Sequence, residues 1–145
     1  MWFFRGCEHL IHSYDGTHQS IEILKMSHRL GIITNGDHGR QFNRFSALTF
    51  RHHFDAELMV CSGSVGYAKP DPRIFRHALE SAEVEPKEAL MVCDWALGDV
   101  AGAQAAGMRG VWFNPEDRDV PESVAPDATI RRFDELPGLL REWSA

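Results

Sequence analysis

Long apolar runs are missing from this sequence, and so is the usual signature of an exported protein. No apolar stretch reaches the roughly 18 residues that a membrane-spanning helix needs. The apolar start, Met1 to Gly6, has no basic leader and no cleavage site, so it does not resemble a signal peptide. We therefore expect a cytoplasmic protein that has no membrane partner.

An excess of positive charge is also missing. The sequence has 15 Lys and Arg residues against 21 Asp and Glu residues, which gives a formal net charge of -6. Binding to nucleic acid requires a basic face that neutralises phosphates, so this balance argues against nucleic acid as a partner. A mildly acidic protein can still hold a small phosphorylated molecule in a locally positive pocket.

Cysteine is sparse, and its three positions, Cys7, Cys61 and Cys93, are widely spaced. No C-x-x-C pair occurs, which argues against a zinc knuckle or a redox pair. We expect free buried thiols in a reducing compartment. The 145 residues, 43% of them hydrophobic and 25% charged, are typical of a single globular domain spanning residues 1–145.

Short apolar runs alternate with amphipathic stretches along the chain. The expected strands cover residues 29–34, 54–61, 89–93 and 109–113, with a short edge strand at 129–131. The expected helices cover residues 17–28, 37–49, a stretch that starts at Pro70-Asp71-Pro72, 98–106 and 135–143, and residues 116–127 read as a surface loop. This alternation predicts an α/β fold, in which a parallel sheet is covered by helices on both faces.

Ligands of such sheets bind beyond the carboxyl ends of the strands, so the polar residues that follow the strands are the candidates for a site. They are Thr34-Asn35, Ser62, Asp94 and Asn114. Thr34-Asn35-Gly36 can offer a hydroxyl and backbone N–H groups to an anion. The alternative is a plain turn that caps the next helix.

Two further groups carry charge. Lys69 precedes the proline-started helix and can neutralise a phosphate or a cluster of carboxylates, unless it is a solvated loop lysine. Asp94 follows a buried strand, and Asp99 stands near the start of the next helix. Both can hold Mg²⁺, which prefers a few carboxylates together with waters and phosphate oxygens. For Asp99 the alternative is a favourable charge at a helix N-terminus.

The order and spacing of Thr34-Asn35-Gly36, Lys69-Pro70 and Asp94 with Asp99 resembles the second, third and fourth motifs of the haloacid dehalogenase (HAD)-like hydrolase superfamily. The resemblance is closest to the capped small-molecule phosphatases, such as pyrimidine-nucleotide phosphatases. It implies a Rossmann-like core and Mg²⁺-dependent hydrolysis of small phosphomonoesters. It also implies site roles: Thr34, Lys69 and Asp99 in catalysis, Thr34, Asn35, Gly36 and Lys69 in phosphate binding, and Asp94 as the metal ligand.

The first motif of that superfamily, Asp-x-Asp-x-Thr after an N-terminal strand, is not found. The most similar segment of the sequence is Ser13-Tyr14-Asp15-Gly16-Thr17, which would put Ser13 in the place of the nucleophile. We interpret residues 14–17 instead as the turn that begins the helix before the second motif. Residues 1–13 then become the remnant of a cap domain, and the central strand of the sheet is missing.

A sheet without its centre exposes two unpaired strand edges. Three repairs are conceivable: Met1 to Phe4 fills the gap, a second copy donates an element and forms an intertwined homodimer, or the sheet pairs again around the gap. The fourth motif also departs from the pattern, because Cys93 replaces the usual Gly and Trp95 replaces a small polar residue.

The expected function is therefore a HAD-like phosphohydrolase core that is truncated and weakly active or inactive by itself. The alternative is a non-catalytic relic or a partner-binding module. Dehalogenation is disfavoured, because the resemblance implies that dehalogenases of this fold lack the carboxylate that Asp94 matches. The histidines, including His52-His53, show no metal-ligand spacing and are expected to be surface or capping residues.

Overall fold

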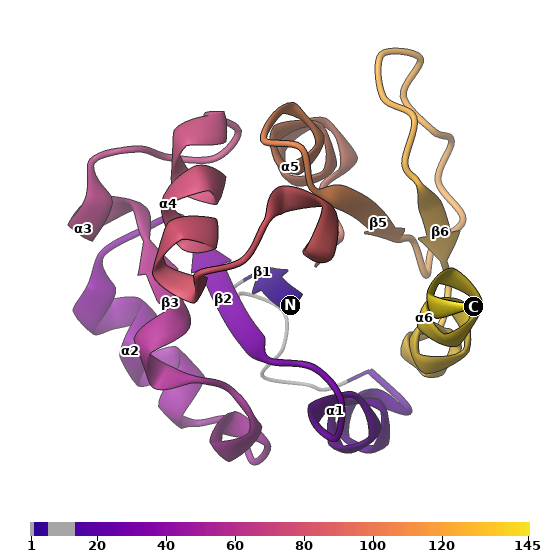
Figure 1. The fold of residues 1–145 in the computed structure, drawn as a ribbon, viewed down its shortest axis with the longest axis horizontal. Coiled ribbons are helices and arrows are strands. Elements are labelled where there is room, and N and C mark those ends of the chain that lie inside the picture. The colour runs from indigo at the N-terminus through magenta and orange to yellow at the C-terminus, as the bar shows by residue number, and fades with distance from the viewer. Residues whose placement is uncertain (1, 6–13) are drawn as a thin grey trace.

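The computed structural model describes the backbone of residues 2–5 and all of residues 14–145. Its parallel sheet has six strands in the order β3-β2-β1-β4-β5-β6 (Figure 1). The strands are β1 (Trp2–Arg5), β2 (Leu30–Thr34), β3 (Met59–Cys61), β4 (Leu90–Cys93), β5 (Arg109–Phe113) and β6 (Ala128–Ile130). The predicted α/β class, a Rossmann-like parallel sheet with helices on both faces, is confirmed.

The helices connect these strands as the alternating pattern predicts. They are α1 (Thr17–Lys25), α2 (His38–Ser46), α3 (Ser62–Val65), α4 (Pro72–Ala82), α5 (Ala101–Ala105) and α6 (Leu136–Ser144). Shorter 3-10 turns are η1 (Arg51–His53), η2 (Ala56–Leu58), η3 (Pro86–Glu88) and η5 (Phe133–Glu135), and η4 (Ala96–Val100) is a π-helix. Within the described part of the chain, every helix is too short or too polar to cross a bilayer.

The centre of the sheet is occupied by β1. Its backbone pairs in parallel with β2 on one side and with β4 on the other, so that Phe4 stands opposite both Ile32 and Val92. Interpreting residues 1–13 wholly as a cap remnant is therefore wrong for residues 2–5. An aromatic run such as Trp2-Phe3-Phe4 has high strand propensity, and here it satisfies the backbone groups of two strands that would otherwise be edges.

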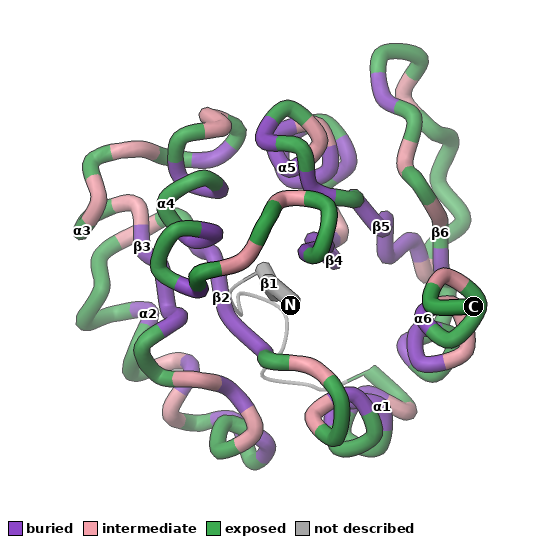
Figure 2. Tube along the Cα trace, viewed as in Figure 1, coloured by how far each residue is buried: buried purple, intermediate pink, exposed green. Residues whose placement is uncertain are grey.

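Two apolar cores lie on the two faces of the sheet. Successive residues of a strand point to opposite faces, so Ile32 belongs to one core and Ile33 to the other. The first core lies under α1, α2 and α6, and the second lies under α4 and α5 (Figures 1 and 2). The strands between them are buried on both faces, as expected for a parallel sheet.

Several expected elements have different bounds, and both α1 and α2 end three residues earlier than expected. The strand expected over 54–61 begins only at Met59, because residues 56–58 form a 3-10 turn in which the N–H of Leu58 donates to the carbonyl of Asp55 (2.9 Å). The helix expected over 98–106 begins earlier, as the π-helix η4, and continues as α5, which ends at Ala105 shortly before Gly107 with φ +88°. Helix α3, directly after β3, was not expected.

Candidate active site

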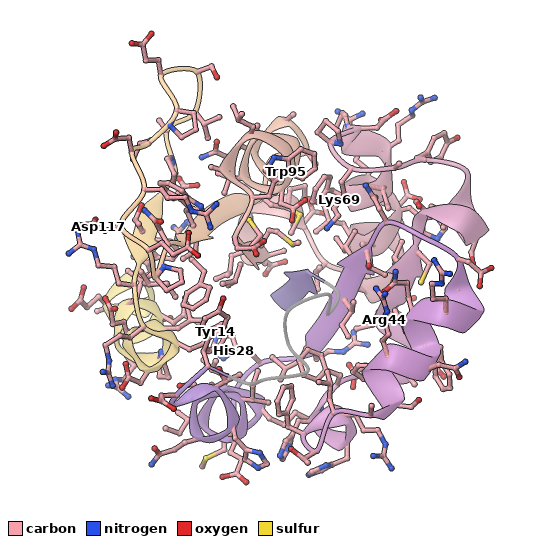
Figure 3. All side chains as sticks on the ribbon, turned by 180° about the vertical axis from the view of Figure 1, so that it is seen from behind. Tyr14, His28, Arg44, Lys69, Trp95 and Asp117 are labelled. Atoms are coloured by element: carbon pink, nitrogen blue, oxygen red, sulfur yellow. The ribbon has the colours of Figure 1, made fainter. Side chains whose placement is uncertain are left out.

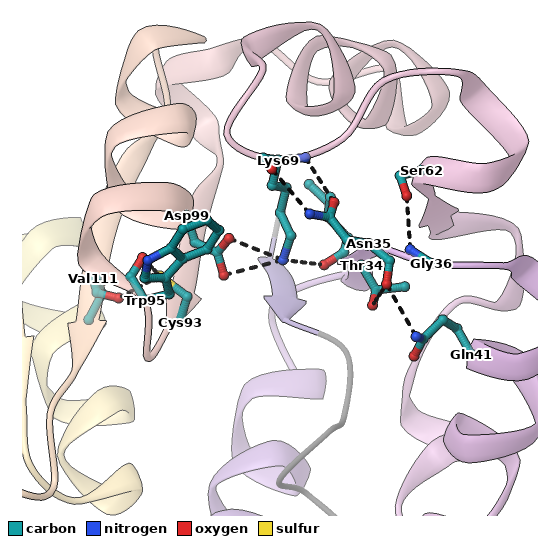
Figure 4. A network of polar contacts seen from close by, with 11 residues as sticks. Thr34, Asn35, Gly36, Gln41, Ser62, Lys69, Cys93, Trp95, Asp99 and Val111 are labelled. Atoms are coloured by element: carbon teal, nitrogen blue, oxygen red, sulfur yellow. Dashed lines mark hydrogen bonds and ion pairs between the residues drawn. The ribbon is translucent and has the colours of Figure 1, made fainter.

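The ammonium group of Lys69 is buried at the carboxyl end of the sheet (Figure 4). Its Nζ donates to the carbonyl oxygen of Ile33 at 3.2 Å and lies 3.2 Å from both carboxylate oxygens of Asp99. The two side chains are only 2% and 0% exposed. A buried charge is tolerated only when it is paired and hydrogen-bonded, so each of these residues requires the other. Lys69 is not a solvated loop lysine.

The side-chain amide of Asn35 holds the backbone of Lys69. The N–H of Lys69 donates to Asn35 Oδ1 at 2.8 Å, and Asn35 Nδ2 donates to the carbonyl oxygen of Lys69 at 3.1 Å. The loop after β2 is thereby joined to the loop before α4. The sequence predicts Asn35 as a phosphate-binding residue, and the structure engages its side chain in positioning Lys69.

Helix α5 fixes the lysine loop from the other side. A Cβ atom at Gly102 would come within 2.7 Å of the carbonyl oxygen of Pro70 and within 2.5 Å of the ring of Phe75. Only glycine permits this approach of α5 to the loop. Asp71 also anchors the loop, because its carboxylate caps α4 by accepting from the N–H of Arg73 at 2.9 Å.

The Thr34-Asn35-Gly36 turn is tied to the end of β3. The N–H of Gly36 donates to Ser62 Oγ at 2.8 Å, and the N–H of Gly63 donates to the carbonyl of Gly36 at 3.0 Å. Gly36 has φ +131°, a conformation that side chains rarely adopt. The sequence marked Ser62 as a strand-end residue, although not as the partner of this turn.

Gln41 was not expected to take part in this turn. Its Nε2 donates to the carbonyl of Asn35 at 3.2 Å, and the hydroxyl of Thr34, which is buried, lies 3.4 Å from the same oxygen. A buried glutamine on an otherwise amphipathic helix is the signal that could have indicated this role.

The two aspartates of the fourth motif lie in different environments. Asp99 is buried within the π-helix η4 and faces Lys69, whereas Asp94, one residue after β4, is half-buried. Trp112, which sequence reasoning missed, positions Asp94 because its Nε1 donates to the carbonyl of Asp94 at 3.2 Å. Turns of π-helix inside helices occur frequently at functional sites. Of the two, Asp94 is the carboxylate that solvent reaches.

Trp95 and Cys93 flank Asp94. Trp95 is 40% exposed, and its ring covers Gly98, where an added Cβ would fall 2.1 Å from the indole. Figures 3 and 4 show Trp95 on the same side of the molecule as Lys69. Burial, followed by the charge of Asp99, raises the pKa of the Cys93 thiol well above its usual value, so little reactive thiolate is present.

The end of β1 lies beside this group of side chains. Arg5 stands opposite Ile33, whose carbonyl accepts from Lys69. The sequence continues as Gly6-Cys7-Glu8 and contains no aspartate before Asp15. Ser13, which would stand at the nucleophile's place in the disfavoured alignment, lies outside the described residues.

The turn before α1 agrees with the preferred alignment of residues 14–17. Thr17 is the first residue of α1, its N–H donates to the carbonyl of Tyr14 at 3.0 Å, and Gly16 adopts φ +81°. Asp15 is exposed on this turn. A further strand-end residue, Asn114, uses its amide to hold the loop at Arg118.

Fold and site together define a Rossmann-like protein with a lysine-carboxylate site at the carboxyl edge of a parallel sheet. The model of the haloacid dehalogenase-like hydrolase family matches residues 4–113, and the chain belongs to this family. It is 38% identical over 121 residues to the pyrimidine 5'-nucleotidase YjjG of Escherichia coli (strain K12), covering 83% of this chain and 53% of that protein.

Two solved structures illustrate the likeness in three dimensions. The HAD-hydrolase YfnB from Bacillus subtilis, solved bound to magnesium, is 27% identical with a TM-score of 0.80, covering 87% of this chain and 55% of that one. A 2-haloacid dehalogenase from Pseudomonas syringae pv. Tomato DC3000 is 36% identical with a TM-score of 0.73, covering 86% and 51%. The chain spans about half the length of the curated relatives it matches.

Proposed function

We propose that this chain forms the phosphate-binding core of a Mg²⁺-dependent phosphohydrolase that acts on small phosphomonoesters. The observation that carries the proposal is the buried ion pair of Lys69 and Asp99 at the carboxyl edge of the sheet. A positive charge fixed there by a carboxylate and a carbonyl is already oriented before any ligand arrives, which is how electrostatic stabilisation of a phosphoryl group works best.

Around that charge, the Thr34-Asn35-Gly36 turn supplies the proposed phosphate contacts. The hydroxyl of Thr34 would donate to a phosphoryl oxygen, together with the backbone N–H groups of Asn35 and Gly36. The N–H of Gly36 already donates to Ser62 Oγ, so binding there requires Ser62 to share or release it. The side chain of Asn35 keeps Lys69 in place by its two bonds to the lysine backbone.

The residues present fit a magnesium ion at Asp94. Mg²⁺ takes one or two protein carboxylates and completes its octahedron with waters and phosphate oxygens. Asp99 has both oxygens within 3.2 Å of the Lys69 ammonium, so the half-buried Asp94 is the better direct ligand. A magnesium ion held there would neutralise phosphoryl charge and orient its oxygens.

We further propose that the chain by itself hydrolyses phosphomonoesters weakly or not at all. Covalent phosphatase chemistry of the kind that the family resemblance implies needs an aspartate at the end of the central strand. The sequence that follows β1 has none before Asp15. The second candidate function, a non-catalytic protein that binds phosphate with the same residues, rests on this observation.

Dehalogenation, the activity of one solved relative, fits the site less well. The strand-end carboxylate Asp94 has no role in the metal-free dehalogenation that the resemblance implies, and a buried ammonium suits a dianionic phosphate. Hydrolysis of 2-chloropropionate, with chloride release measured by ion chromatography, would favour this alternative over the phosphatase.

The test is hydrolysis of p-nitrophenyl phosphate with and without Mg²⁺, using the wild type, Asp94→Asn and the matched control Asp119→Asn in the exposed loop 116–127. We expect little or no turnover by the wild type. Mg²⁺-dependent turnover that disappears only in Asp94→Asn would support the phosphatase and show that the chain contains a nucleophile. Turnover that is equal in all three proteins would contradict the proposed role of Asp94.

A further inference from the structure

A second group of side chains of the types that can hold a metal ion lies on α1 and η1, elements that do not contribute to the Lys69 site. His18 and Glu22 stand one turn apart on the surface of α1, and His53 ends η1. One ligand atom from each residue lies within 4.8 Å of the ligand atoms of the other two. The sequence shows no metal-ligand spacing for the histidines, and the structure brings His53 to the pair on α1 from more than thirty positions away. These three residues form the His18–Glu22–His53 cluster.

The geometry within the cluster is close to what a tetrahedral ion needs. His18 Nε2 lies 3.3 Å from Glu22 Oε1. In a tetrahedral zinc site with bonds of about 2.0–2.1 Å, neighbouring ligand atoms are about 3.3 Å apart. Only the distances from these two atoms to the ligand atom of His53 must shorten. The side chains of His18 and Glu22 are 48% and 55% exposed, so they are free to turn towards His53.

His53 provides an independent observation. Its Nε2 is buried and has no hydrogen-bond partner among the described residues. Buried polar atoms almost always have a partner, and one without it requires an explanation such as a water or an ion. The ring is held by packing, since it lies 4.0 Å from the ring of His52 and edge-on to that of His18.

We propose that the His18–Glu22–His53 cluster binds a Zn²⁺ ion and thereby ties α1 to η1. Two imidazoles and one carboxylate suit zinc or another borderline transition metal, whereas Mg²⁺ and Ca²⁺ prefer oxygen ligands alone. Three protein ligands leave a fourth position for water. The simpler explanation is a surface pair of His18 and Glu22 with no metal, as commonly found at this spacing on helices.

The experiment is a calorimetric titration of ZnCl₂ into the metal-free protein, together with thermal unfolding with and without Zn²⁺. The variants are His18→Gln and His53→Gln, and the control is His77→Gln on the exposed face of α4. We expect about one equivalent of Zn²⁺ to bind the wild type and to raise its unfolding temperature, because a ligand of the folded state stabilises it. Both cluster variants should lose at least about tenfold in affinity, and His77→Gln should not.

His18 is exposed, so His18→Gln provides a folded variant even if His53→Gln fails to fold. Titration with Co²⁺ gives a second readout, because a tetrahedral site with nitrogen and oxygen ligands produces visible absorption bands. Zn²⁺ binding that is equally strong in the wild type and in His18→Gln would overturn the proposal, since the ion would then sit elsewhere. A wild type that binds no Zn²⁺ would overturn it as well.

Discussion

Lys69 and Asp99 form an almost completely buried ion pair at the carboxyl end of the sheet, with Nζ 3.2 Å from each carboxylate oxygen. The residues are far apart in the sequence, and Lys69 comes from a loop whereas Asp99 comes from the π-helix η4. Their pairing joins the loop before α4 to the π-helix η4 and sets the charge of the candidate site.

Removing one member of this pair should be costly. Lys69→Met leaves a buried Asp99 without its cation, and we expect it to lower the free energy of unfolding by about 3–5 kcal/mol. The double variant Lys69→Met/Asp99→Leu replaces the pair with apolar groups and should recover much of that loss. Urea unfolding followed by circular dichroism measures both, and a single variant as stable as the wild type would contradict the buried pairing.

Asn35 should act through Lys69. Asn35→Ala removes both side-chain bonds to the lysine backbone, and we expect a loss of about 1–3 kcal/mol in unfolding free energy. Asn43→Ala, an exposed position on α2, is the matched control and should have little effect. If the two variants are equally stable in urea, the two bonds from the amide contribute nothing to stability.

Gly102 should not tolerate a methyl group. Gly102→Ala forces α5 away from Pro70 and Phe75, which we expect to cost about 1–3 kcal/mol of stability. Gly138→Ala in α6, where the added Cβ would lie 3.9 Å from the side chain of Arg141, should instead stabilise the protein by about 0.5–1 kcal/mol. The unfolding temperatures of the two variants should shift in opposite directions from that of the wild type. Shifts in the same direction would contradict the packing described.

The charge of Asp71 should stabilise the fold only above acidic pH. Hydrogen bonds from the side chain and backbone of Arg73 lower the pKa of Asp71 from 3.8 to about 2. A carboxyl group whose pKa is lower in the folded state contributes stability above its unfolded pKa, and this is lost as the pH falls through the folded value. Asn can still cap the helix, so Asp71→Asn isolates the charge.

Urea unfolding between about pH 6 and pH 2 tests this linkage. The wild type should be more stable than Asp71→Asn at the upper end, and the difference should shrink below about pH 4. A difference that stays constant over the whole range would mean that the charge of Asp71 contributes nothing.

The thiol of Cys93 should be inert in the folded protein. Its pKa is raised by burial and by Asp99, so at about pH 8 iodoacetamide should modify it only after unfolding in urea. Peptide mapping by mass spectrometry separates Cys93 from Cys61, which is also buried. Rapid modification of Cys93 in the native protein would contradict its placement at the end of β4.

Much of the sheet could be predicted from the sequence, because strands buried on both faces are continuous apolar runs such as Leu30–Thr34 and Leu90–Cys93. The sequence left the place of Trp2–Arg5 open as one of three alternatives, since four residues without the expected motif carry no sign of their neighbours in the sheet. The exact partners of that strand depend on pairing between distant segments.

The candidate site was predictable as a set of positions and not as a set of contacts. The spacing of Thr34, Lys69 and Asp94 indicated one edge of the sheet, because strands in a parallel sheet end together. The two bonds from Asn35 to Lys69 and the hydrogen bond from Trp112 to Asp94 join residues that are far apart in the chain. No periodicity encodes such contacts.

The central claim is that the carboxyl edge of the sheet is a phosphate site, whether or not the chain catalyses hydrolysis. Calorimetric titration of inorganic phosphate in the presence of Mg²⁺ tests it most directly, with the wild type, Thr34→Val and the control Thr129→Val on the exposed side of β6. We predict saturable binding to the wild type and to Thr129→Val, and binding weakened by about tenfold in Thr34→Val, which lacks the hydroxyl donor. Equal affinity in all three proteins, or no binding to any of them, would contradict the account.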